Sequence, residues 1–229
     1  MVRDGLVFLS RLNAFWLAVS RLKALVKRET SALRHGVVEI FDKPLLSVGG
    51  KPLLQHHIEH LAVNGITEVI INTSWLADKI EDYFGDGSDY GINITWSRES
   101  EPLETGGGIK KALPLLGDQP FLLINGDIWT DFKVSSVLNY QLSDDQAAWL
   151  LLVENPEHNP EGDFGLANDL VSYQPQIKYT FSGISLIRPQ LIMDYIHNQT
   201  KQQFFPLRDV LRPAIEAQAV SGAVYRGQW

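Results

Sequence analysis

Two short stretches of the chain carry residues suited to phosphate and metal chemistry. Gly106, Gly107 and Gly108 stand consecutively before an apolar stretch, and Asp127 follows a glycine at the end of another apolar run. Bare backbone N–H groups at a helix start bind anions, and a carboxylate supplies the oxygen ligands that Mg²⁺ prefers. A divalent ion beside phosphate-binding glycines is the minimal equipment for transfer of a nucleotidyl group, where positioning and charge neutralisation matter most.

The elements around these stretches predict a parallel sheet with helices on both faces. In the first part of the chain, strands and helices alternate, and the strands are continuously apolar. That pattern is typical of a Rossmann-like, doubly wound α/β fold with a mostly parallel sheet. The predicted strands are 67–73, 92–96, 121–125 and 147–155, and the predicted helices are 52–65, 74–85 (capped by Ser74), 109–116 and 133–142.

After Asn155 the pattern changes to shorter strands behind a loop rich in proline and glycine. We expect this β-rich half to join the same, mixed sheet. Its predicted strands lie around 164–166, 170–173, 177–187 and 222–227, and its predicted helices are 189–196 and 207–217.

Three polar loops follow predicted strands and should therefore open on one rim of the sheet. They are 101–108, 125–131 and 154–164. In doubly wound sheets, ligands bind beyond the carboxyl ends of the strands. The glycines and Asp127 are thus expected to face a common crevice.

Each signal also has a simpler interpretation. Three glycines are compatible with a tight turn, and a lone Gly-Asp pair is compatible with a turn cap. His56, Glu59 and His60 stand in the H-x-x-E-H order of one class of zinc proteases. Because such short motifs recur by chance and this helix needs its apolar stripe for packing, solvated or half-buried histidines are the favoured interpretation.

Composition narrows the class of protein. The 229 residues contain no cysteine, so disulfides and thiolate metal sites are excluded, and a reducing cytoplasm is the expected compartment. A net charge of −7 argues against nucleic-acid binding. Residues 1–40 differ, with seven basic and three acidic side chains, but Arg11, Arg21 and Lys23 interrupt any membrane-spanning stretch. No membrane or nucleic-acid partner is therefore expected.

Several motifs resemble the sugar-1-phosphate nucleotidyltransferases: "DKPLLSVGGKPLL", "EPLETGGG", "NGDIWTD", "GDF" and "FSGIS". The resemblance runs from about Asp42 to Trp229 and is strongest to the branch that acts on N-acetylmuramate 1-phosphate in peptidoglycan recycling. It implies a nucleotidyltransferase fold, UTP and a sugar 1-phosphate as substrates, Mg²⁺ as cofactor and pyrophosphate as product. The sequence leaves open guanylyl transfer to mannose 1-phosphate or a glucose-1-phosphate type of reaction.

The resemblance also implies roles for individual residues. Lys43 matches a lysine that neutralises the UTP phosphates, and Asp127 matches a Mg²⁺ ligand; these are the expected catalytic residues. The loop that ends at Gly108 matches the loop that contacts the nucleotide base. The expected nucleotide-binding residues besides Lys43 are Glu104, Thr105, Gly106, Gly107, Gly108 and Asn125, and the expected sugar-phosphate-binding residues are Asn155, Asp163 and Gly183.

The chain departs from the family pattern at its beginning. Family members open with a short apolar strand and a G-x-G-x-R-M-x-P loop around the triphosphate, and residues 1–40 are predicted to contain neither. A second Mg²⁺-binding aspartate follows the segment that matches "YRGQW", where the sequence stops. We therefore expect an atypical segment 1–40, then a nucleotidyltransferase domain 41–229 with a nucleotide-binding half, 41–154, and a sugar-phosphate-binding half, 155–229. A catalytically impaired fragment of the family is the alternative.

Overall fold

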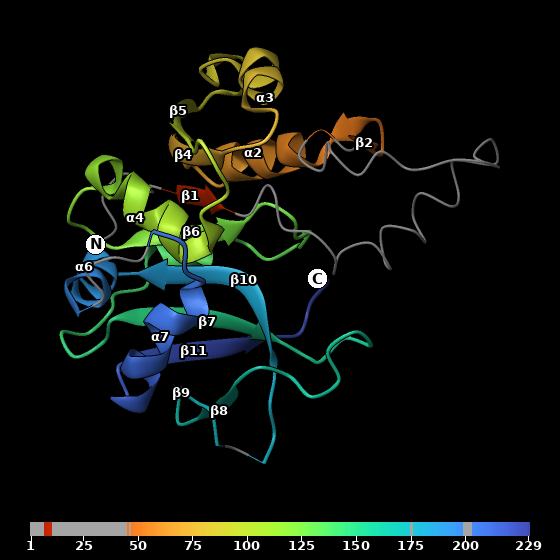
Figure 1. The fold of residues 1–229 in the computed structure, drawn as a ribbon. Helices are drawn as coiled ribbons and strands as arrows, with labels where there is room; N and C mark the ends of the chain where they lie inside the picture. The colour runs from red at the N-terminus through yellow and green to blue at the C-terminus, as the bar shows by residue number, and fades with distance from the viewer. Residues whose placement is uncertain (1–6, 11–44, 46, 175, 199–202) are drawn as a thin grey trace, which may run out of the picture.

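A mixed sheet of nine strands forms the centre of the protein in a computed structural model (Figure 1). The structure describes residues 7–10, 45, 47–174, 176–198 and 203–229. The strand order is β5-β4-β1-β6-β10-β7-β11-β9-β8, and a two-stranded hairpin, β2-β3, stands apart from it. Both predicted halves supply strands to the one sheet, as the sequence led us to expect.

The sequence predicted most of the elements. The strands are β1 (Val7–Ser10), β2 (Ser47–Val48), β3 (Lys51–Pro52), β4 (Glu68–Thr73), β5 (Asn93–Arg98), β6 (Phe121–Asn125), β7 (Ala148–Val153), β8 (Gly165–Ala167), β9 (Leu170–Ser172), β10 (Thr180–Ile187) and β11 (Val220–Tyr225). The helices are α2 (Leu53–Val63), α3 (Ala77–Phe84), the 3₁₀ turn η3 (Ser88–Tyr90), α4 (Glu104–Leu116), α5 (Ser135–Leu138), α6 (Pro189–Asn198) and α7 (Leu207–Glu216).

The expectation that no strand precedes the family-like region is wrong. β1 lies in the middle of the sheet, parallel to β4 on one side and to β6 on the other, with Phe8 level with Ile70 and Leu123. The chain therefore fills the central position that was predicted to be empty, and no sheet edge is left exposed there. The segment 36–41, considered as a substitute strand, lies outside the described residues, so the predicted boundary at residue 40 stays a prediction.

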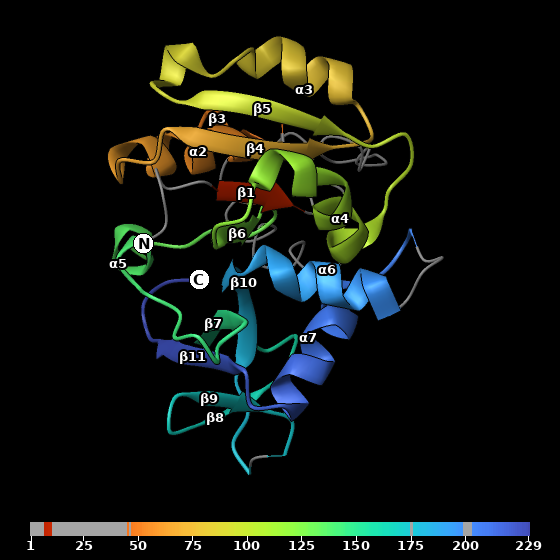
Figure 2. The ribbon, with the colours of Figure 1, turned by 90° about the vertical axis from the view of Figure 1, so that its left-hand side faces the viewer.

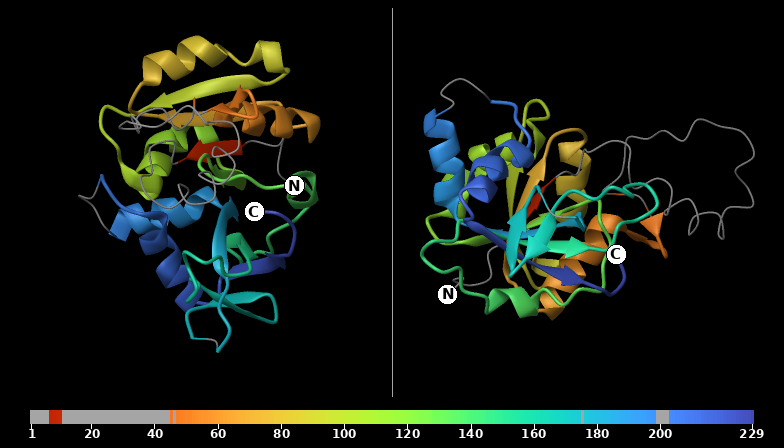
Figure 3. Two further views of the ribbon diagram at one scale, coloured as in Figure 1. Left: turned by 90° about the vertical axis from the view of Figure 1, so that its right-hand side faces the viewer. Right: turned by 90° about the horizontal axis from the view of Figure 1, so that it is seen from below.

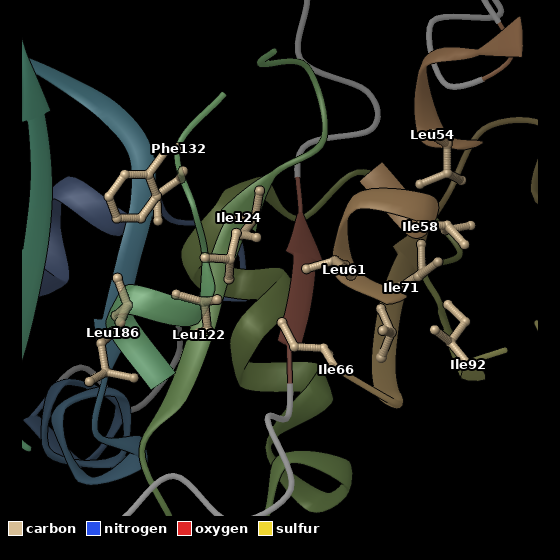
Figure 4. Close-up of a cluster of buried hydrophobic side chains, with 14 of the residues drawn as sticks. Leu54, Ile58, Leu61, Ile66, Ile71, Ile92, Leu122, Ile124, Phe132 and Leu186 are labelled. Atoms are coloured by element: carbon tan, nitrogen blue, oxygen red, sulfur yellow. The ribbon is translucent and has the colours of Figure 1, made fainter. Parts of the chain in front are cut away.

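Alternation along the strands divides the core into two layers. Leu122 and Ile124 of β6 face the side covered by α2 and α3, where Leu54, Ile58 and Leu61 complete the cluster (Figure 4). The neighbouring positions of β6 face the other side, which α4, α6 and α7 cover (Figure 2). A sheet buried on both faces explains why its strands read as continuous apolar runs.

Three helix predictions need correction. α3 begins at Ala77 after Leu76, whose φ is 57°, so Ser74 is not its cap. Only Ser135–Leu138 of the predicted helix 133–142 is helical. α4 begins at Glu104, before the glycines and not after them. Every helix in the described part of the chain is too short or too polar to cross a membrane.

Candidate active site

The carboxyl ends of the parallel strands lie level with one another and form the predicted rim. Thr73 at the end of β4 pairs with Arg98 at the end of β5, and Val153 at the end of β7 pairs with Tyr225 at the end of β11. Because β10 runs the other way, its first residue, Thr180, joins the same edge beside Val153. Figure 3 (left) looks onto this rim, with the C-terminus near its middle.

Asp127 lies on the rim where the sequence predicted it. The residue stands two positions beyond the end of β6, in the turn that begins at Gly126, and its side chain is half-buried. Asn125, the last residue of the strand, is buried. Within the described residues, no cluster of three or more acidic or histidine side chains forms a metal cage. A single half-buried carboxylate fits Mg²⁺, which takes one or two protein carboxylates together with substrate phosphates.

The three glycines are buried in the first two turns of α4, and not in a loop before the helix. The N–H of Gly107 donates to the carbonyl of Phe205, 3.2 Å away, so it is not free for an anion. A Cβ on Gly106 would lie 2.4 Å from the Phe205 ring, and one on Gly107 would lie 2.3 Å from the Gln203 carbonyl oxygen. These two glycines let the chain segment before α7 approach the helix backbone. Their role in binding a base stays a prediction.

Gly108 makes room for a buried polar pair that the sequence did not reveal. Asn72 Nδ2 donates to Glu99 Oε1 at 2.8 Å, and the N–H of Leu103 donates to Glu99 Oε2 at 3.0 Å. Burial raises the pKa of the Glu99 carboxyl, although both hydrogen bonds oppose that change. A Cβ on Gly108 would lie 2.8 Å from Glu99 Oε1. The pair thus fixes the loop that leads to Glu104 and Thr105, of which Glu104 is exposed and Thr105 is buried.

Asn155 and Asp163 brace the rim at the start of β10. The Asn155 amide donates to the Lys178 carbonyl at 3.0 Å, and its oxygen accepts from the Thr180 hydroxyl at 3.0 Å. Asp163 accepts the N–H of Phe181 at 2.8 Å. Both side chains are exposed enough to meet a ligand, but in this conformation they hold the loop. Their predicted contact with a sugar phosphate is untested.

Gly183 lies within β10 where the pairing with β7 shifts register, and its φ of 87° suits glycine. A Cβ there would lie 2.8 Å from Asn125 Nδ2. The predicted sugar-site glycine and the predicted nucleotide-site asparagine are therefore direct neighbours. Lys43, the remaining predicted residue, lies outside the described residues.

The last residues of the chain fold back onto the loop after β6. Asp131 accepts hydrogen bonds from the Tyr225 hydroxyl at 2.5 Å and from the Gln228 N–H at 2.8 Å, and these bonds lower the pKa of its carboxyl. The Trp229 indole donates to the Ser182 carbonyl at 2.7 Å and stacks on His158. The C-terminal segment therefore forms part of the rim. The acidic residue of "NGDIWTD" after Asp127 was the available signal, and it was not used.

The histidines of α2 do not form a zinc site. His56 Nε2 lies 2.8 Å from the Val48 carbonyl and His60 Nε2 lies 3.0 Å from the Phe132 carbonyl. A carbonyl oxygen can only accept, so each ring donates its Nε2–H there and offers no lone pair at that atom. Glu59 forms an ion pair with Lys51 at 2.8 Å. The interpretation as half-buried helix residues is confirmed.

Comparison with known proteins agrees with this architecture. The family model "Nucleotidyl transferase" matches residues 38–171. The chain belongs to the nucleotidyl transferase family. This nucleotidyltransferase is 45% identical over 194 residues to the N-acetylmuramate alpha-1-phosphate uridylyltransferase of Neisseria meningitidis serogroup B, an alignment that covers 82% of each chain.

More distant relatives match a smaller part of this nucleotidyltransferase. The mannose-1-phosphate guanylyltransferase of Mycobacterium tuberculosis is 35% identical over 111 residues, which cover 48% of this chain and 31% of the relative. A solved structure of a putative glucose-1-phosphate thymidylyltransferase from Bacillus anthracis superimposes with a TM-score of 0.74 at 15% identity, covering 99% of this chain and 88% of that one. That similarity confirms the predicted nucleotidyltransferase fold.

Proposed function

We propose that this nucleotidyltransferase transfers the uridylyl group of UTP to N-acetylmuramate 1-phosphate, as a step in the reuse of cell-wall sugars in the cytoplasm. The observation that carries the proposal is the 45% identity over 82% of both chains to a uridylyltransferase of that substrate. Relatives that use GTP and mannose 1-phosphate match less than half as much of the chain at lower identity, as the Mycobacterium enzyme does. The muramate branch is therefore favoured.

The reaction exchanges one phosphoanhydride bond for another. A phosphate oxygen of the sugar 1-phosphate attacks the α-phosphorus of UTP in line, the bond from the α-phosphorus to the bridging oxygen breaks, and pyrophosphate leaves with both electrons of that bond. No covalent enzyme intermediate is needed. Mg²⁺, when bound, supplies charge neutralisation for the phosphates.

The residues of the rim supply position and charge. Asp127 would hold the metal at the end of β6, and Lys43 would add positive charge against the UTP phosphates. The helix α4 and the loop held by Glu99 would present the surface for the base, and the loop braced by Asn155 and Asp163 would present that for the sugar phosphate. Since the described surface must otherwise receive anions in a protein of net charge −7, the metal and the lysine are needed to offset this charge.

A substrate panel tests the proposal. The purified chain, in excess over nucleotide, is mixed with Mg²⁺, with UTP or GTP, and with the 1-phosphates of N-acetylmuramate, mannose or glucose. We expect a UDP-sugar and pyrophosphate only with UTP and N-acetylmuramate 1-phosphate. Because residues 1–40 lack the G-x-G-x-R-M-x-P sequence, we expect slow turnover, and protein in excess makes even a single turnover visible by mass spectrometry. Product only from GTP and mannose 1-phosphate would reject the assignment.

A further inference from the structure

Three histidines on α2 each reach a different segment at the edge of the site. His56 bonds to the Val48 carbonyl in the β2-β3 hairpin, and His60 bonds to the Phe132 carbonyl. His57 lies between them and makes its hydrogen bonds to the backbone of Gly126 and Ile128. Those two residues flank Asp127 on either side. One helix thus fastens the turn that carries the predicted metal ligand.

His57 is a buried, neutral ring with one usable proton. Its Nε2 is fully buried, and within the described part of the chain no hydrogen-bond partner lies near it. The bonds to Gly126 and Ile128 are therefore made from Nδ1, and because their acceptors are backbone carbonyls, Nδ1 carries the proton. Burial disfavours a second proton on the ring. The single donor of His57 is committed to the turn.

The turn needs a brace from outside because its own bonding is weak. The N–H of Ile128 reaches the carbonyl of Asn125 only at 3.4 Å, which is long for an amide hydrogen bond. Gly126, next in the turn, has no side chain to restrict its backbone. A carboxylate held on such a turn would sample several positions, and a metal site depends on ligands held in place by their surroundings.

We propose that His57 is a positioning residue for the metal site: its Nδ1–H holds the backbone of Gly126 and Ile128 and thereby fixes the direction of Asp127. The inference rests on the proposed function, in which Asp127 binds Mg²⁺. Loss of a group that supports a metal ligand typically costs about 10-fold to 100-fold in metal affinity or activity. His57 is thus required for metal-dependent nucleotide binding and does not itself touch the nucleotide.

The test measures how much Mg²⁺ strengthens nucleotide binding, as the ratio of the Kd for UTP in EDTA to the Kd for UTP with Mg²⁺. A general loss of stability would not change this ratio. The full chain is compared with His57→Leu, which removes the donor, and with His57→Asn, whose side-chain N–H lies near the position of Nδ1. His60→Leu is the matched control, since His60 holds Phe132 and not the Asp127 turn. Asp127→Ala tests the metal ligand itself, and urea unfolding checks that each variant folds.

We expect Asp127→Ala to abolish the gain from Mg²⁺, His57→Leu to reduce it by about 10-fold or more, and His57→Asn and His60→Leu to keep it within about 3-fold. If Asp127→Ala abolishes the gain and His57→Leu does not change it, the inference is wrong and the proposed function stands. If His60→Leu reduces the gain as much as His57→Leu, or His57→Asn fails to restore it, the inference is also wrong. If Asp127→Ala leaves the gain intact, the proposed metal ligand is wrong, and the inference falls with it.

Discussion

Replacing Gly107 with alanine separates a packing role of the glycine helix from a ligand-binding role. At an open helix position, this change would stabilise the protein by about 1 kcal/mol, because alanine is the better helix former. At Gly107, however, the new Cβ would lie 2.3 Å from the Gln203 carbonyl oxygen and 2.9 Å from Leu103 Cβ. Both neighbours belong to the protein, and one is backbone, so the segment at Gln203 must move.

The size of the effect follows from these contacts. Overpacking of this kind costs about 1–3 kcal/mol, and displacement of residues 203–205 would also weaken the 3.2 Å bond from the Gly107 N–H to Phe205, worth about 1 kcal/mol. After subtracting the gain in helix propensity, we expect a free energy of unfolding lower by about 2 kcal/mol.

Urea unfolding followed by circular dichroism measures this difference from the shift in midpoint at unchanged slope. Leu115→Ala in the same helix is the control, because Leu115 is 47% exposed and its truncation should change stability by less than about 0.5 kcal/mol. A Gly107→Ala variant as stable as the parent, or more stable, would refute the packing argument. If that stable variant bound UTP more weakly, the glycine would instead serve the ligand.

Three further predictions concern buried and tethered polar groups. Burial lowers the pKa of His57 to about 4 from 6.5, so the neutral ring stabilises the fold fully above pH 6.5; this contribution should be lost as the pH falls toward 4, by about 3 kcal/mol in the free energy of unfolding, and His57→Asn should flatten that dependence in urea titrations. Glu99→Ala leaves the buried Asn72 amide without its acceptor and should cost about 2 kcal/mol by the same assay, and an unaffected midpoint would contradict the buried pair. Asp131→Ala should release the Gln228 N–H, and faster exchange of that amide measured by NMR checks it; unchanged protection would show that the tail is held elsewhere.

The sequence predicted the parts of the fold whose signals are local. The strand 121–125 was predicted with the bounds that β6 has, because its apolar run ends at a glycine turn. β1 was missed because four apolar residues followed by more apolar residues do not distinguish a strand from a helix segment. The start of α4 was misplaced because glycine has a low helix propensity, while the contacts with Gln203 and Phe205 that favour the helix come from far along the chain.

The same distinction applies to the site. Asp127 was placed on the rim because position after a strand is a local property. The partners of His57 and Glu99 lie on other elements, and no spacing in the sequence indicates that α2 supports the turn at Gly126 or that β4 supplies an amide to Glu99. Side chains that hold a site in place are therefore seen only when the elements are brought together.

The central claim is that Asp127 holds the metal for uridylyl transfer, and the most direct measurement is the rate of UDP-sugar formation by Asp127→Asn. The substitution keeps the size of the side chain and removes its charge. Loss of several kcal/mol of transition-state stabilisation corresponds to a fall of about 100-fold or more in rate. The account predicts that fall with an unchanged circular dichroism spectrum. A folded Asp127→Asn protein that forms UDP-N-acetylmuramate at nearly the parent rate would contradict it.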